Sequence, residues 1–189
     1  MQILEKNKLE IEQKAGKMSD FLKMEYLEEC TKKFHDIEIL RYCYSELSKL
    51  YEKRNMFSEA IKNMTKFKEF CILQKEKTEC FKKEIELYIR NGNYERAEMV
   101  FREGIHELKD TDRLELKRKI IEAYKQEMAR FEKANMMSGA LKVYEKLAHH
   151  LVDKERNEVR KKMVIAYKKL GRIRESLELE RELNREVVV

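Results

Sequence analysis

The chain has 189 residues, enough for one substantial domain or one extended array of repeats. Charged residues make up 41% of it and apolar residues 42%, and there are five glycines, no proline and no tryptophan, which is typical of an almost wholly helical protein and excludes an intrinsically disordered one. The net charge of +6 allows an acidic partner without requiring one.

Neither the N-terminus nor the cysteines point to a secreted or metal-binding protein. The first residues, MQILEKNKLE, carry charges where a signal peptide needs an apolar run, and no stretch approaches the roughly 20 apolar residues of a membrane span. Cys30, Cys43, Cys71 and Cys80 lack the close spacing of metal ligands. We therefore expect an intracellular protein, cytoplasmic or nuclear, with reduced thiols and neither a metal nor a cofactor.

Apolar residues recur at helical spacing along the whole chain and predict ten helices. In chain order these are expected at 3–14, 19–34, 37–53, 57–74, 79–90, 94–108, 112–134, 138–150, 154–169 and 173–186. No linker rich in proline, glycine or serine separates them, so residues 1–189 are predicted to form a single domain.

A glycine or an asparagine breaks the helical pattern at nearly regular intervals. Gly16, Asn55, Gly92, Asn135 and Gly171 are 39, 37, 43 and 36 residues apart. Both residue types tolerate the left-handed backbone conformation that closes many helices. Each break is therefore predicted to end one helix so that the next folds back on it.

The positions around the breaks also repeat. The last four breaks have an aromatic residue four positions before them, a large apolar residue two positions after and a small residue five positions after. A small residue opposite large ones lets two helices pack closely. The residues predicted to pack within the repeats are Tyr51, Phe57, Ala60, Tyr88, Gly92, Tyr94, Ala97, Phe101, Phe131, Ala140, Tyr144, Tyr167 and Gly171. The expected hairpins are roughly 1–36, 37–76, 77–110, 111–152 and 153–189.

The segment LYIRNGNYERAEMVFREGI, residues 87–105, resembles a tetratricopeptide repeat, although the repeat is longer than that family's ~34 residues and lacks its proline and tryptophan. The resemblance implies an all-α fold, a right-handed α-solenoid of about five antiparallel helix hairpins. Through Glu95, Arg96, Ala97 and Phe101, the same segment also resembles, as a second choice, the half-a-tetratricopeptide (HAT) repeats of RNA-processing scaffolds.

In such repeats the first helix of each hairpin lines a concave groove, and here its predicted positions carry a surplus of basic residues. The candidate partner-binding residues are Lys49, Lys53, Lys82, Lys83, Arg90, Lys125, Lys161, Lys162, Lys168 and Lys169. The resemblance therefore implies a non-catalytic scaffold or adaptor that presents a mildly basic groove to an acidic or helical peptide of a partner protein. The alternatives are a HAT-like component of an RNA-processing complex, with direct or indirect RNA contact, and a trafficking-type adaptor.

An enzyme is not expected, and no catalytic residue is assigned. The chain has no phosphate-binding glycine loop, no zinc-protease motif and no nucleophile elbow. His149 and His150 are adjacent on a predicted helix, so their side chains point about 100° apart and only one of them is expected to face solvent. The oligomeric state is left open.

Overall fold

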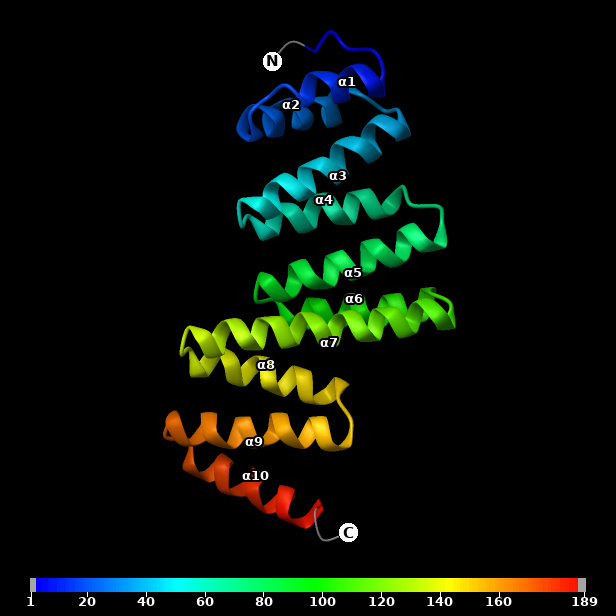
Figure 1. The fold of residues 1–189 in the computed structure, drawn as a ribbon. Helices are drawn as coiled ribbons and strands as arrows, with labels where there is room; N and C mark the ends of the chain where they lie inside the picture. Colours follow the sequence, from blue (N-terminus) through cyan, green and yellow to red (C-terminus); the bar gives the residue numbers. More distant parts are fainter. Residues whose placement is uncertain (1–2, 187–189) are drawn as a thin grey trace. The chain divides into compact units, whose positions relative to one another are not determined.

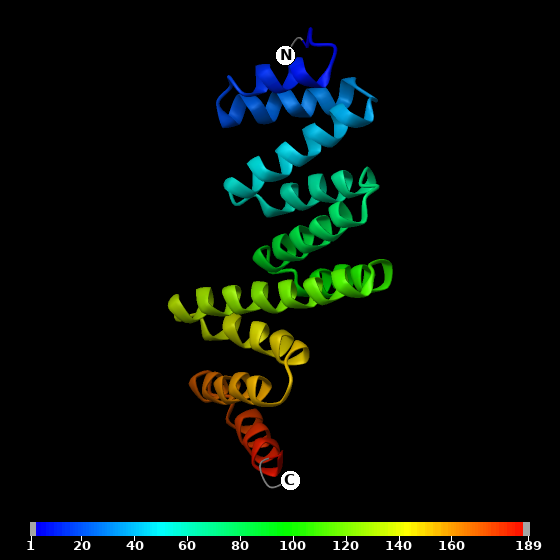
Figure 2. The ribbon, with the colours of Figure 1, turned by 45° about the vertical axis from the view of Figure 1, so that its right-hand side comes forward.

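The computed structural model describes residues 3–186, which form ten α-helices and no strand (Figures 1 and 2). The helices are α1 (Lys8–Ala15), α2 (Asp20–Lys33), α3 (Ile37–Lys53), α4 (Phe57–Glu69), α5 (Gln74–Arg90), α6 (Tyr94–Glu107), α7 (Asp110–Lys133), α8 (Met137–His150), α9 (Asp153–Lys169) and α10 (Ile173–Glu186). The predicted all-α fold of helical hairpins is confirmed. None of these helices has the length and apolar character needed to cross a membrane.

Three predicted helix boundaries are wrong. The first helix begins at Lys8, not at residue 3, because the Asn7 side chain caps it by accepting a hydrogen bond from the Glu10 backbone N–H. The fourth helix ends at Glu69 and the fifth begins at Gln74, so the predicted hairpin boundary between 76 and 77 falls inside α5. The connection between α4 and α5 contains neither glycine nor proline, which is why the sequence pattern gave no signal for it.

Four of the five predicted breaks adopt the expected left-handed conformation. Asn55, Gly92, Asn135 and Gly171 have φ angles of 59°, 74°, 54° and 73°. In each turn, the N–H of this residue donates to the carbonyl three residues earlier, and the next N–H donates to the carbonyl of the aromatic residue, at 2.9–3.1 Å. This is the Schellman motif. Gly16 differs, because its φ of −64° is right-handed and it ends α1 without that motif.

The other connections follow a second pattern, in which an apolar side chain is buried or half-buried just after a helix ends. Phe34, Leu108 and Leu151 are extended residues that cap α2, α6 and α8, and Cys71 lies in the connection after α4. They are spaced by 37, 37 and 43 residues. The repeat is therefore marked twice, once by glycine or asparagine within a hairpin and once by a buried or half-buried apolar residue between hairpins.

The first compact unit, Met1–Asp112, contains α1 to α6, and successive helices pack side by side (Figures 1 and 2). Its helices bury one apolar stripe each; on α3 the stripe includes Ile39, Cys43 and Leu47. The small residues Ala60 and Ala97 have no exposed surface, as close helix packing requires.

The second unit, Arg113–Val189, contains nearly all of α7 together with α8, α9 and α10. The small residues Ala140 and Ser176, at the same repeat position as Ala60 and Ala97, again have no exposed surface. Gly139 is also required here, since a Cβ atom at this position would lie 2.4 Å from the Phe131 ring. The two units are described separately, and the predicted single domain and right-handed superhelix stay predictions.

Candidate partner-binding surface

The ten basic residues predicted to bind a partner lie on the first helices of four hairpins, α3, α5, α7 and α9. Eight of them form an ion pair with a carboxylate of the same unit. These are Lys49, Lys53, Lys82, Lys83, Arg90, Lys125, Lys162 and Lys168. Most of the predicted partner-binding residues are therefore already paired with the protein's own acidic side chains.

In unit 1, one face of α3 lines a hollow of about 480 Å³ together with residues of α1 and α4. Of the predicted partner-binding residues, Lys49 lines this hollow, next to Tyr42, Ser45 and Glu46 of the same helix. Three acidic and three basic side chains border it, so it carries no surplus of positive charge. A concave site is present on α3, but its lining does not favour an acidic ligand over a basic one.

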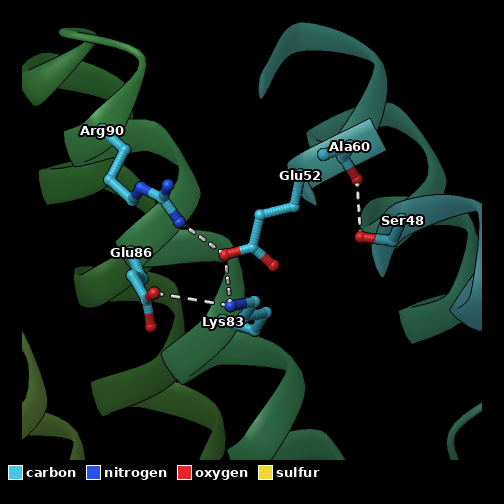
Figure 3. Close-up of polar contacts among 6 residues, drawn as sticks. All are labelled: Ser48, Glu52, Ala60, Lys83, Glu86 and Arg90. Carbon is cyan, nitrogen blue, oxygen red and sulfur yellow. Dashed lines mark hydrogen bonds and ion pairs between the residues drawn. The ribbon is translucent and has the colours of Figure 1, made fainter. Parts of the chain in front are cut away.

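A carboxylate shared by two cations joins α3 to α5. Oε1 of Glu52 accepts hydrogen bonds from Lys83 Nζ at 2.8 Å and from an Arg90 guanidinium nitrogen at 2.6 Å, and Lys83 also contacts Glu86 at 3.4 Å (Figure 3). The Arg90 guanidinium lies 4.6 Å from the centre of the Phe57 ring, a cation–π distance. Lys83 and Arg90 thus connect neighbouring hairpins, a role that the sequence analysis did not assign to them.

The predicted residues of α3 are also engaged within unit 1. Lys49 contacts Glu46 at 2.8 Å, and Lys23 contacts the other oxygen of the same carboxylate at 2.7 Å. Burial alone would raise the pKa of Glu46, but the hydrogen bonds from these two lysines outweigh it and hold the pKa below its ordinary value. Lys53 reaches Asp20 of the preceding hairpin at 2.6 Å.

Unit 2 repeats the same kind of bridge. Glu132 of α7 accepts hydrogen bonds from Lys162 of α9 at 2.8 Å and from the Tyr144 hydroxyl of α8 at 2.7 Å. Burial would raise the pKa of Glu132, but these two hydrogen bonds keep it below its usual range. Glu132 and Glu52 occupy the same repeat position, one residue after the aromatic residue that precedes the turn. Lys162 and Lys83 also share a position, five residues before the aromatic residue of their own helix.

These bridges left a signal in the sequence that the analysis missed. In both cases a glutamate near the end of one first helix precedes a lysine on the next first helix, by 31 residues for Glu52 and Lys83 and by 30 for Glu132 and Lys162. A charge pair at such a spacing has no meaning on a single helix. It becomes meaningful only when the repeat length is known and the two positions are superposed.

One lysine-rich surface keeps cations without carboxylate partners. We call Lys161, Lys162, Ile165, Lys168 and Lys169 the α9 lysine face, because their spacing places them on one side of the helix. Lys161 and Lys169 are exposed and make no ion pair within residues 3–186, while Lys162 and Lys168 pair with Glu132 and with Glu180. Ile165 lies between them and is 54% exposed. This face combines unneutralised positive charge with an accessible apolar side chain.

The two histidines at the end of α8 have different surroundings, as the sequence analysis expected. The His150 ring stacks on the Tyr124 ring with a centroid distance of 5.9 Å. His149 is exposed and lines a shallow hollow of about 370 Å³ with Arg156 and Arg160. No group of three or more histidine, cysteine, aspartate or glutamate side chains that could hold a metal ion occurs in the described part of the chain.

Comparison with known proteins yields similar structures but no family. No family model matches the chain, and no curated protein matches it. The solved structures similar to it include the C-terminal part of a TPR repeat-containing protein from Cytophaga hutchinsonii, with 14% identity over 94% of this chain and 63% of that one and a TM-score of 0.42. This chain therefore spans less than two thirds of that structure.

Two further structures show similar values. One is the nearly identical TPR-like repeats of a putative kinesin light chain from Podospora anserina, with 14% identity over 94% of this chain and 91% of that one and a TM-score of 0.40. The other is BtubC (BKLC) from P. vanneervenii, with 14% identity over 85% and 68% of the two chains and a TM-score of 0.36. Likeness at this level says nothing about what the protein binds, and the assignment of helical hairpins rests on the helices and turns described above.

Proposed function

We propose that this protein is a non-catalytic scaffold that uses the α9 lysine face to bind an acidic, amphipathic segment of a partner protein. The observation that carries the proposal is the pair of exposed lysines without carboxylate partners, Lys161 and Lys169, on either side of the exposed Ile165. The predicted partner-binding residues of unit 1 all form ion pairs with carboxylates of the same unit. The proposed surface thus involves one helix, α9, whereas the groove expected from the sequence involves the first helices of four hairpins.

The spacing of the three side chains indicates the shape of the ligand. Lys161, Ile165 and Lys169 follow one another at intervals of four residues along α9, so the Cα atoms of the two lysines are about 12 Å apart along the helix axis. A partner helix with carboxylates two turns apart and an apolar residue between them matches this arrangement. Because exposed ion pairs contribute only about 0–1 kcal/mol each, the apolar contact with Ile165 is needed for affinity.

The side chains of α9 favour a protein ligand over single-stranded RNA. RNA single strands bind to exposed aromatic rings on which bases stack, besides lysines that contact phosphates. The aromatic residue of α9, Tyr167, is buried, and the Arg172 guanidinium lies 4.8 Å from the centre of its ring. An interleaved acidic side chain, Glu158, also weakens any continuous track for phosphates. The experiment below measures RNA binding alongside peptide binding.

Fluorescence anisotropy with defined probes tests the proposal. The first probe is a helical peptide with two glutamates eight positions apart and a leucine midway, the second is a scrambled peptide of the same composition, and the third is a single-stranded RNA of equal charge. We expect the wild type to bind the ordered peptide more tightly than the other two probes. Binding should weaken as salt rises, because exposed charges are screened beyond a Debye length of about 8 Å at physiological ionic strength.

Two double variants with the same change in charge separate this face from general electrostatics. Lys161→Glu/Lys169→Glu alters the α9 lysine face, whereas Lys142→Glu/Arg181→Glu alters exposed basic residues of α8 and α10. The first variant should bind the ordered peptide at least tenfold more weakly, and the second should bind it nearly as well as the wild type. Equal losses in both variants, or tighter binding of the RNA than of the peptide, would contradict the proposal.

A further inference from the structure

Two buried thiols of unit 1 lie in contact near the connection between α4 and α5. The Sγ atoms of Cys71 and Cys80 are 3.3 Å apart, and the two residues are 4% and 2% exposed. Both cysteines are reduced. A disulfide requires the sulfur atoms to approach to about 2.05 Å, so only a small rearrangement separates this dithiol from a covalent bond.

Cys71 lies outside the helices. It lies in residues 70–73, between two helices, where its thiol contacts the Phe67 carbonyl oxygen at 3.6 Å and its backbone N–H donates to the Lys68 carbonyl. The two following residues, Ile72 and Leu73, are 83% and 64% exposed. Short connections with exposed side chains open locally at a lower free energy than helices do. A small opening of this connection would expose the Cys71 thiol while both helices stay intact.

The second thiol pair of unit 1 provides an internal contrast. Cys30 and Cys43 each shift the pKa of the other, but they lie inside α2 and α3 and have no exposed surface. Reaching either thiol requires separation of the two helices, which is a larger and costlier opening. Unit 1 thus contains one buried pair with a thiol in a connection and one buried pair with both thiols inside helices.

The surroundings of Cys80 assign different roles to the two sulfurs. Burial, the hydrogen bond with Cys71 and the nearby Glu84 carboxylate raise the pKa of the Cys80 thiol, against a smaller opposing effect of Lys68. Cys80 therefore stays protonated inside the unit. Cys71 lies in the connection, so its sulfur is the one that an oxidant meets when the connection opens.

We propose that Cys71 and Cys80 are an oxidation site, a dithiol that a hydroperoxide converts into an intramolecular disulfide joining the α4–α5 connection to α5. In the first step the Cys71 sulfur gives up its proton and attacks the terminal oxygen of the hydroperoxide, the O–O bond breaks, and the sulfur becomes a sulfenic acid. The leaving oxygen takes up that proton and departs as an alcohol or, from hydrogen peroxide, as water. In the second step the Cys80 sulfur attacks the sulfenic sulfur, the S–S bond forms, and the Cys80 proton leaves with the sulfenic hydroxyl as water. Two thiols lose two electrons and two protons, and one peroxide is reduced.

This site is independent of the proposed binding function, because it lies in unit 1 and uses none of the residues of the α9 lysine face. Its expected consequence is a stiffer connection. A cross-link between residues 71 and 80 closes a short loop and reduces the freedom of the unfolded chain, so the oxidised protein should unfold at a higher temperature than the reduced one.

Peptide mapping of the full chain after oxidation tests the proposal. The reduced protein is treated with a small excess of hydrogen peroxide, remaining thiols are alkylated, and the protein is cleaved after lysine and arginine. Each cysteine then lies on a different peptide: MEYLEECTK, YCYSELSK, EFCILQK and TECFK. We expect EFCILQK and TECFK to be recovered joined by a disulfide, while the peptides of Cys30 and Cys43 are recovered alkylated.

Isosteric variants serve as controls. Cys80→Ser should abolish the cross-link and trap oxidised Cys71 as a sulfenic acid, detectable with a dimedone-type reagent, whereas Cys30→Ser should form the cross-link at the wild-type rate. The wild-type experiment decides the matter even if a variant folds poorly. The proposal is overturned if the Cys71 and Cys80 peptides stay alkylated, if they join no faster than those of Cys30 and Cys43, or if the cross-links join two chains.

Discussion

Equivalent lysines have different roles in the two units. In unit 1, Lys82, Lys83 and Arg90 of α5 all contact carboxylates, and two of them converge on Glu52 of the preceding hairpin. In unit 2, Lys162 makes the equivalent bridge to Glu132, but Lys161 beside it has no ion pair in the described part of the chain. A lysine on a first helix is thus held within the fold where its own helix or a neighbouring hairpin supplies a paired carboxylate.

The largest stability effect is expected at the most buried of these ion pairs. Glu84 of α5 accepts hydrogen bonds from Lys68 at 2.7 Å and from Thr65 at 2.8 Å, and its side chain is only 3% exposed. Replacing it with alanine leaves a half-buried ammonium and a hydroxyl without partners. We expect Glu84→Ala to lower the free energy of unfolding by about 2–3 kcal/mol, measured by urea denaturation. The matched change in unit 2, Glu155→Ala at an exposed pair, should have an effect too small to measure.

The Schellman turns allow the same test in each unit. Gly92 and Gly171 have φ angles of 74° and 73°, and a Cβ atom at either position would meet nothing within 4 Å. Substitution by alanine therefore adds backbone strain and no steric clash. We expect Gly92→Ala and Gly171→Ala each to cost about 1–2 kcal/mol in thermal or urea unfolding.

The asparagine turns supply the control for that series. Asn55→Gly and Asn135→Gly place glycine at the same left-handed position, where it is at least as well tolerated, so neither should destabilise the protein. A loss comparable to that of the alanine variants would mean that the asparagine side chains, not the backbone conformation, hold these turns.

The sequence predicted the fold well where the signal is local. A left-handed turn selects glycine or asparagine by backbone sterics alone, so the breaks at Asn55, Gly92, Asn135 and Gly171 were readable without the structure. The connection at Cys71 was not, because a buried apolar side chain after a helix resembles the helix's own apolar stripe. The ion pairs of the predicted partner-binding residues could not be read from the sequence for a related reason: Lys83 pairs with Glu52, which lies 31 residues away and on another helix.

Acid titration should act on both units through their lysine-paired glutamates. The pKa values of Glu46 in unit 1 and Glu132 in unit 2 are depressed in the folded protein, so each contributes stability that is present above the ordinary glutamate pKa of 4.5 and is lost as the pH falls through the folded-state pKa. Glu46→Gln and Glu132→Gln should each reduce the difference in Tm between neutral and acidic pH. Glu46 should have the larger effect, since its side chain is 22% exposed and that of Glu132 is 33% exposed. An unchanged pH profile in both variants would show that other carboxylates dominate acid unfolding.

The smallest effects on the free energy of unfolding are expected at Lys83 of unit 1, which is ion-paired, and at Lys161 of unit 2, which is not. Lys83→Ala removes contacts with Glu52 and Glu86, but Arg90 still pairs with Glu52, so the loss in the free energy of unfolding should be only about 0.5 kcal/mol. Lys161→Ala removes an exposed side chain without an ion pair. It should leave the free energy of unfolding unchanged and weaken binding of the acidic peptide. Urea unfolding and peptide anisotropy on the same samples measure both quantities. If Lys161→Ala destabilised the protein as much as Lys83→Ala does, Lys161 would have to be bound within the fold in solution, and the α9 lysine face could not be free to bind a partner.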